Sequence, residues 1–127
     1  MRAQISVETL LVFLLFLVLL GIAYTAASKL GAASQNQINA ALSRETLNEL
    51  SSRIESVCLL GEGNKRVVDV KGEAVKLSIA PGNGRQLEFS APHFSGTIDS
   101  PCPISSVPNG AARSFTITNT GASVEIS

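Results

Sequence analysis

The chain has 127 residues, of which 45% are hydrophobic, 16% charged and 5% aromatic. This length accommodates one modest domain and excludes a multidomain enzyme. Ten lysines and arginines balance ten aspartates and glutamates, and a net charge of zero argues against the basic surface that nucleic-acid binding requires. The charges are unevenly spread, because residues 9–28 contain none.

The uncharged segment contains the most apolar stretch of the chain. Residues 10–20 read LLVFLLFLVLL, and residues 21–27 are mostly apolar or small. About 20 helical residues span ~30 Å, the thickness of the hydrocarbon core of a bilayer. An ordinary secretory signal has a shorter apolar region, although Thr25, Ala26 and Ala27 leave cleavage after Ala27 open as an alternative. We therefore expect a membrane-spanning helix near the N-terminus.

Helix-forming residues continue beyond the apolar run, and no proline precedes Pro81. The composition predicts one helix from about Ser6 to Leu60, ended by Gly61 and Gly63. Its distal half carries two apolar stripes on nearly opposite sides. The first comprises Leu30, Ile38, Ala41 and Leu42, and the second comprises Leu47, Leu50, Ile54 and Val57. The second would cover the protein's own sheet and the first would meet a neighbouring molecule, unless both form one stripe that drifts around a single packed surface.

From Lys65 onward, hydrophobic and polar residues alternate with the period of half-buried antiparallel strands. Glycine-containing turns between the alternating runs predict hairpins at Lys71-Gly72, residues 81–84 and Thr120-Gly121. The residues expected to face inward are Val68, Val70, Val75, Leu77, Ile79, Leu87, Phe89, Phe115, Ile117, Val124 and Ile126. Residues 91–110 contain four of the five prolines and are predicted to form an irregular surface loop. The expected fold class is α+β, a long N-terminal helix packed on a small antiparallel sheet.

A short polar motif precedes the apolar run. Met1, Arg2 and Ala3 are followed by the pattern Q-x-S-x-E, formed by Gln4, Ser6 and Glu8. In these residues the chain resembles archaeal type IV pilin-like proteins with a class III signal peptide, whose short leader carries a basic residue at the position of Arg2. The resemblance covers about the first quarter of the chain. The chain departs from the family in two places, since many relatives have glycine in place of Ala3 and leucine in place of Val12.

The resemblance implies cleavage between Ala3 and Gln4 by a prepilin peptidase on the cytoplasmic face, with the hydrophobic helix retained. Residues 1–3 would be the leader, 4–28 the transmembrane and filament-core helix, 29–60 its amphipathic continuation and 61–127 the β-domain. The precursor would be anchored in membrane lipid with its β-domain extracytoplasmic. Mature subunits would then stack their helices into a cell-surface filament with other copies and related pilins, helped by an assembly membrane protein and an ATPase.

Glu8 admits two interpretations. A carboxylate carried to the middle of a bilayer costs about 2.5–3.5 kcal/mol, so Glu8 needs a partner or a surface position. In the first turn of a helix capped by Ser6, the helix dipole would favour its charge and the side chain would reach the lipid headgroups. The context of the motif favours the other interpretation, in which Glu8 pairs with the new α-amino group of Gln4 on an adjacent subunit inside a dry filament core.

The remaining candidate sites are few. Cys58 and Cys102 are the only cysteines, and in an extracytoplasmic domain we expect a disulfide worth ~4 kcal/mol in the chain-entropy model. Two buried reduced thiols are the alternative. His93 is the single histidine, and no base, nucleophile or ligand spacing accompanies it, so we expect no catalytic site, no metal site and no cofactor.

These features predict a structural protein rather than an enzyme or a nucleic-acid-binding protein. We expect a pilin subunit that polymerises through its helix into an adhesive filament, with residues 91–110 as its outward, partner-specific surface. The alternatives are a membrane-anchored binding module that does not assemble, a pseudopilin of a secretion system, and a secreted domain that begins at Ser28. No pattern in the sequence separates a major from a minor subunit or names the surface that is recognised.

Overall fold

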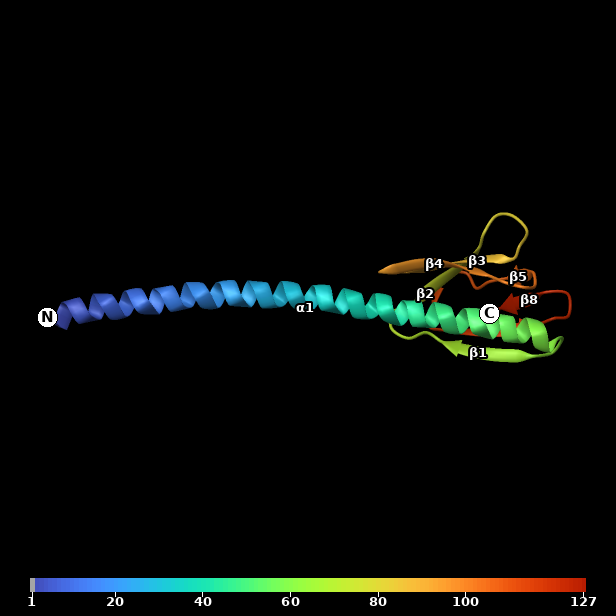
Figure 1. Cartoon of the computed structure of the whole chain (residues 1–127), viewed down its shortest axis with the longest axis horizontal. Helices are drawn as coiled ribbons and strands as arrows, with labels where there is room; N and C mark the ends of the chain where they lie inside the picture. The colour runs from blue at the N-terminus through green and yellow to red at the C-terminus, as the bar shows by residue number, and fades with distance from the viewer. Residues whose placement is uncertain (1) are drawn as a thin grey trace. The chain divides into compact units, whose positions relative to one another are not determined.

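The computed structural model describes the backbone of residues 2–127 and the side chains from Ser6 onward. Helix α1 (Arg2–Leu60) is continuous, and strands β1 to β8 follow it (Figure 1). The chain divides into two compact units, Met1–Asn36 and Gln37–Ser127. The distal part of α1, from Gln37 onward, therefore belongs to the same unit as all the strands. The helix ends at the predicted place, where Gly61 adopts a positive φ of 84° that favours glycine.

The strands of the second unit form two four-stranded sheets. The first has the order β1 (Lys65–Asp69), β7 (Ser114–Asn119), β8 (Val124–Ile126) and β5 (Ile104–Ser106). The second has the order β4 (Phe94–Asp99), β3 (Gln86–Ala91), β2 (Val75–Ile79) and β6 (Ala111–Ala112). Neighbouring strands are antiparallel except β5 and β8, which are parallel. The α+β class is confirmed, with two small sheets where one was expected.

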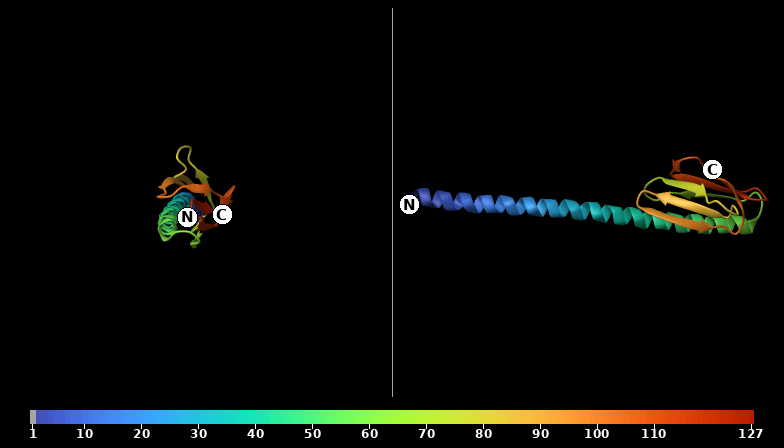
Figure 2. Two further views of the ribbon diagram at one scale, coloured as in Figure 1. Left: turned by 90° about the vertical axis from the view of Figure 1, so that its right-hand side faces the viewer. Right: turned by 90° about the horizontal axis from the view of Figure 1, so that it is seen from above.

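One hydrophobic core lies among the two sheets and the distal part of α1, which runs alongside both of them (Figure 2). The second apolar stripe of the helix enters this core: Leu50, Ile54 and Val57 are fully buried, and Leu47 packs against them half-buried. The predicted inward residues of the strands are buried, except that Val70 and Ile79 are only partly so. The alternation of the strands thus matches the face that each sheet turns toward the helix.

The first apolar stripe lies outside this core. Leu30 is 71% and Ile38 51% exposed, and Ala41 is also exposed. Leu42 departs from the expected pattern, because it is half-buried. It lies next to Gly72, where an added Cβ would be 3.4 Å from Leu42 Cβ. The stripe that the protein leaves uncovered therefore consists of Leu30, Ile38 and Ala41.

Two of the three predicted hairpins are confirmed. Residues 81–84 connect the paired strands β2 and β3, and Thr120-Gly121 lies between the paired strands β7 and β8. The hairpin predicted at Lys71-Gly72 is wrong, because β1 and β2 belong to different sheets. This connection is held by the helix instead: the Lys71 N–H donates to Thr46 Oγ1 at 3.1 Å, and Lys71 Nζ lies 2.6 Å from Glu45 Oε1.

The irregular loop predicted for residues 91–110 is also wrong, since β4 and β5 lie within it. Ala91 and Phe94 are partners in the β3–β4 register, so Pro92 and the following residue form a two-residue turn. Each proline of this segment lies outside the strands, where its missing N–H costs no ladder hydrogen bond. The alternation of β4 is obscured in the sequence because an inward position is occupied by Gly96, where a Cβ would come within 2.7 Å of Leu47 Cδ1.

Candidate functional site

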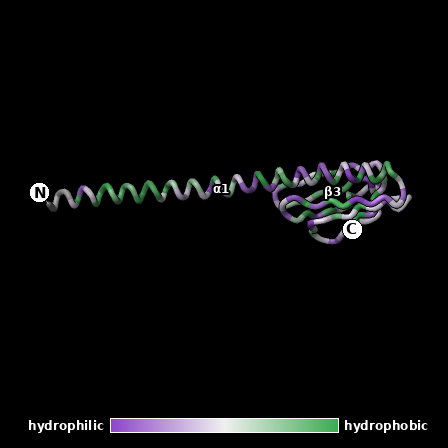
Figure 3. The backbone as a smooth tube through the Cα atoms, turned by 90° about the horizontal axis from the view of Figure 1, so that it is seen from below, coloured by the Kyte–Doolittle hydropathy of each residue, from purple (hydrophilic) through white to green (hydrophobic). Residues whose placement is uncertain are grey.

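The apolar run of α1 is exposed in the first unit. The side chains of residues 10–20 are 51–64% exposed, and no residue of the most apolar window is buried among the described residues. Figure 3 shows this run as the most hydrophobic part of the chain. By length and composition, the helix is suited to cross a membrane. Large apolar side chains gain about 1.5–3 kcal/mol each when they pass from water into an apolar surrounding, so this surface calls for lipid or protein around it.

The polar motif before the apolar run lies inside the helix. Because α1 already includes Arg2, neither Ser6 nor Glu8 occupies its first turn, so the predicted cap at Ser6 is wrong. Alanine and glutamine, the residues at positions 3 and 4, are good helix formers, which explains why the helix extends back through them. The Glu8 side chain is exposed on the helix surface. The side chains of Arg2, Ala3 and Gln4 lie outside the described residues.

The two cysteines form a disulfide, as predicted. Cys58 lies in the last turn of α1 and Cys102 between β4 and β5, with their Cα atoms 6.0 Å apart. Ser100 stabilises the crossing: its Oγ donates to the Cys102 carbonyl at 2.6 Å and lies 3.8 Å from Cys58 Sγ. The disulfide therefore fastens the end of the helix to the segment that joins the two sheets.

Two asparagines satisfy the C-terminal end of α1, where the last carbonyls of a helix have no partner within it. Asn119 is buried, and its Nδ2 donates to the Val57 carbonyl at 3.0 Å while its Oδ1 accepts from the Gly121 N–H at 2.8 Å. Asn64 Nδ2 donates to the carbonyls of Leu60 and Gly61. Neither role was predicted from the sequence. For Asn64 the available signal was its position next to the glycines that end the helix, whereas no local pattern marks Asn119.

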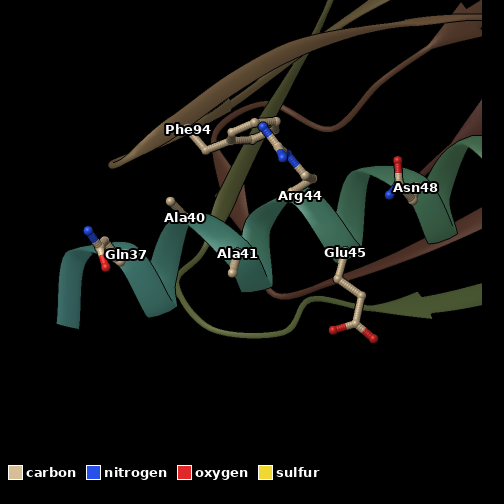
Figure 4. Close-up of a pocket in the computed structure, with 7 residues that line it drawn as sticks. All are labelled: Gln37, Ala40, Ala41, Arg44, Glu45, Asn48 and Phe94. Atoms are coloured by element: carbon tan, nitrogen blue, oxygen red, sulfur yellow. The ribbon is translucent and has the colours of Figure 1, made fainter. Parts of the chain in front are cut away.

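A cleft of about 450 Å³ lies between α1 and the beginning of β4 in the second unit. Its lining residues are Gln37, Ala40, Ala41, Arg44, Glu45, Asn48 and Phe94. Figure 4 shows that Arg44 extends from the helix toward Phe94, whereas Glu45 points away to the opposite side. The Arg44 guanidinium carbon lies 5.7 Å from the centre of the Phe94 ring, within the range of a cation–π contact.

The charges around this cleft are largely paired. Glu45 faces Lys71, and its hydrogen bond and charge raise the pKa of Lys71 above the ordinary value of 10.5. His93 Nε2 lies 4.0 Å from Glu73 Oε2 in a partly exposed contact. Among the side chains from Ser6 onward, no group of three residues is arranged to hold a metal ion. The cleft thus combines one aromatic ring, one guanidinium, two amides and the carboxylate of Glu45 that is paired with Lys71, a set suited to binding and lacking a nucleophile with its base.

Comparisons with known proteins found no matching family model, no matching curated protein and no matching solved structure. The long apolar helix packed on small sheets is consistent with a pilin-like fold.

Proposed function

We propose that this chain is a structural subunit of a cell-surface filament of the archaeal type IV pilin kind. The observation that carries the proposal is the place of the Q-x-S-x-E pattern, formed by Gln4, Ser6 and Glu8, directly before the exposed apolar surface of residues 10–20. The distal part of the same helix packs in a disulfide-bonded β unit. A helix of this kind needs an apolar environment, and a filament core supplies one after the membrane.

In this proposal the precursor is anchored in lipid with its β unit outside the cell, where an oxidising environment suits the disulfide. A prepilin peptidase cuts between Ala3 and Gln4, and an assembly ATPase with its membrane protein adds the subunit to the filament. Assembly exchanges lipid contacts for helix packing. Large side chains at residues 10–20 supply contact area, and Gly21, Ala23 and Ala26 allow close approach.

Intact mass and N-terminal sequencing of the chain from its native membrane or surface fraction test the processing step. A mature chain that begins at Gln4 supports the proposal. A chain that begins at Ser28 contradicts it, because the filament helix has then been removed. An intact Met1 in purified surface material contradicts it too and favours an anchored binding module.

Glu8→Ala tests the assembly step, because the proposal pairs Glu8 with the α-amino group of Gln4 on a neighbouring subunit. We expect fewer filaments by electron microscopy of sheared surface material, with membrane insertion unchanged. Because Glu8 also belongs to the processing motif, the filaments are compared only between chains that N-terminal sequencing shows to begin at Gln4. Glu55→Ala is the matched control, since Glu55 is an exposed glutamate on the same helix. Normal filaments with Glu8→Ala, or equal loss with Glu55→Ala, would refute the pairing.

A further inference from the structure

Arg44 is the unpaired cation of the cleft described above. Among the side chains from Ser6 onward, the ion pairs join Arg53 to Glu49 and Lys71 to Glu45, and neither includes Arg44. The carboxylate next to it in the chain, Glu45, is neutralised by Lys71 at 2.6 Å and points away from the cleft (Figure 4). The cleft therefore carries a net positive charge at one fixed place.

The Phe94 ring orients this charge. The guanidinium carbon lies over the ring, 5.7 Å from its centre, so the aromatic ring attracts the charge while the N–H groups of Arg44 remain available for a ligand. A planar guanidinium held in this way loses little freedom on binding and presents two parallel N–H groups that match a carboxylate. The first requirement on a ligand is thus a carboxylate group.

The rest of the lining indicates what the carboxylate is attached to. Gln37 and Asn48 flank Arg44 along α1, about 16 Å apart by helical rise. Each side-chain amide both donates and accepts hydrogen bonds, which suits hydroxyl groups. The small side chain of Ala40, on the Phe94 side of the helix, leaves room for a ring (Figure 4). The volume of about 450 Å³ lies within the ~300–1,000 Å³ of small-molecule sites.

We propose that this cleft binds an acidic saccharide, with a carboxylate on Arg44, hydroxyl groups of the same sugar unit on Asn48, and those of an adjoining unit on Gln37. In an adhesive filament, this site would determine which ligands are bound. Only this biological use of the site rests on the proposed function. Binding itself is a property of one chain. It can be measured on unassembled protein, so its failure is distinguishable from a failure to form filaments.

The test is a titration of the full chain in detergent micelles with D-glucuronate and trigalacturonate, using glucose as the neutral probe at the same ionic strength. We expect the amide NMR signals of Arg44, Asn48 and Phe94 to shift with the two acidic probes and to stay unchanged with glucose. Equal binding of glucose, or no binding of either acidic probe, would overturn the proposal. Acetate that binds as tightly as glucuronate, or an aspartate-rich peptide that binds more tightly, would overturn its saccharide part.

Variants separate the site from general charge effects. Arg44→Gln should weaken binding at least about tenfold, because a charge-assisted hydrogen bond is lost. Arg44→Lys should lie between this variant and the wild type, because lysine keeps the charge without the planar fork. Arg53→Gln is the matched control, as Arg53 is an exposed arginine of the same helix, already paired with Glu49 at 3.8 Å.

Equal loss of binding in Arg53→Gln would show a diffuse charge effect and overturn the assignment. The amide spectrum away from the cleft reports whether each variant folds, and Phe94→Leu tests the ring independently of the charge. Filaments should still form from Arg44→Gln chains. Their loss in a correctly folded variant would identify the cleft as a contact between subunits and would also overturn the proposal.

Discussion

Removal of the Cys58–Cys102 disulfide measures how much of the second unit's stability comes from covalent closure. The bonded cysteines are 44 positions apart, and in the chain-entropy model opening a loop of this size stabilises the unfolded chain by about 4 kcal/mol. Small domains have about 5–15 kcal/mol of stability in total, so this loss is a large fraction. At about 4–8 °C per kcal/mol, the melting temperature should fall by roughly 15–30 °C.

The assay is urea unfolding of the full Cys58→Ala/Cys102→Ala chain in detergent micelles, followed by the methyl NMR signals of Ile54 and Ile117. Both side chains are buried in the core, so their signals report on the second unit rather than on the apolar helix. Wild-type protein in dithiothreitol should unfold at the same urea concentration as the double variant. Agreement between the reduced and the substituted chains would exclude a packing effect of alanine.

Ser100→Ala distinguishes the crosslink from its surroundings, because the Ser100 hydroxyl donates to the Cys102 carbonyl and approaches Cys58 Sγ. We expect this variant to lose only about 1–2 kcal/mol, because the hydroxyl donates to the Cys102 carbonyl and accepts from the Cys102 N–H. Two results would contradict a loop-closure effect. In one, the double cysteine variant has a free energy of unfolding within ~1 kcal/mol of the wild type; in the other, Ser100→Ala lowers the free energy of unfolding as much as the double cysteine variant does.

Three further substitutions test contacts made by polar side chains of the second unit. Asn119→Ala should lower the free energy of unfolding by about 2 kcal/mol, because it leaves a carbonyl in the last turn of α1 without its donor; exposed Asn109→Ala should change nothing in the same urea assay. Glu45→Gln should return the pKa of Lys71 to its ordinary value, as read by NMR titration of the ammonium group. Since that pKa is raised in the folded state, the pair stabilises the unit below the ordinary pKa and this stability is lost as the pH rises through the raised one. Thr46→Val should speed hydrogen exchange of the Lys71 amide and cost about 1 kcal/mol, and unchanged exchange would contradict the described hydrogen bond.

The periodic elements could be predicted from the sequence because their signals are local. The helical stripe of Leu50, Ile54 and Val57 repeats every three or four residues, and the strands alternate with a period of two. These patterns identify the buried face of each element before its partner is known. For the same reason the helix end at Gly61 and the hairpin at residues 81–84 were predictable, since turn chemistry depends on adjacent residues.

The features that were missed depend on residues distant in the sequence. β4 was hidden because Gly96 occupies an inward position, where only contact with Leu47 shows why a side chain would be excluded. Lys71-Gly72 has the composition of a hairpin turn, but its amide and ammonium groups bind the helix 25 and 26 positions earlier. Local turn propensity has no information on such a partner.

The cleft was missed for a similar reason. Arg44 and Phe94 are 50 positions apart, and neither has an unusual local context. Arg44 lies on the side of the helix flanking the second apolar stripe, and Phe94 follows a proline turn predicted as part of an irregular loop. Only the packing of β4 beside Leu47 brings the ring within 5.7 Å of the guanidinium. Binding sites assembled from two elements generally escape analysis of either element alone.

The two units differ in how completely they bury their own apolar side chains. In the second, the inward positions are covered by the helix, and no described buried side-chain nitrogen or oxygen lacks a hydrogen-bond partner. In the first, large apolar side chains remain exposed along residues 10–20. Lipid tails and neighbouring helices satisfy such a surface almost equally well, so the apolar contacts alone do not favour assembly over anchoring. A preference for the filament over the membrane must therefore come from close helix packing at small residues such as Gly21, and from a polar group that is more stable in the filament core than in lipid. Glu8 is the only carboxylate of this unit, and a partner charge in a dry core would stabilise it where lipid cannot.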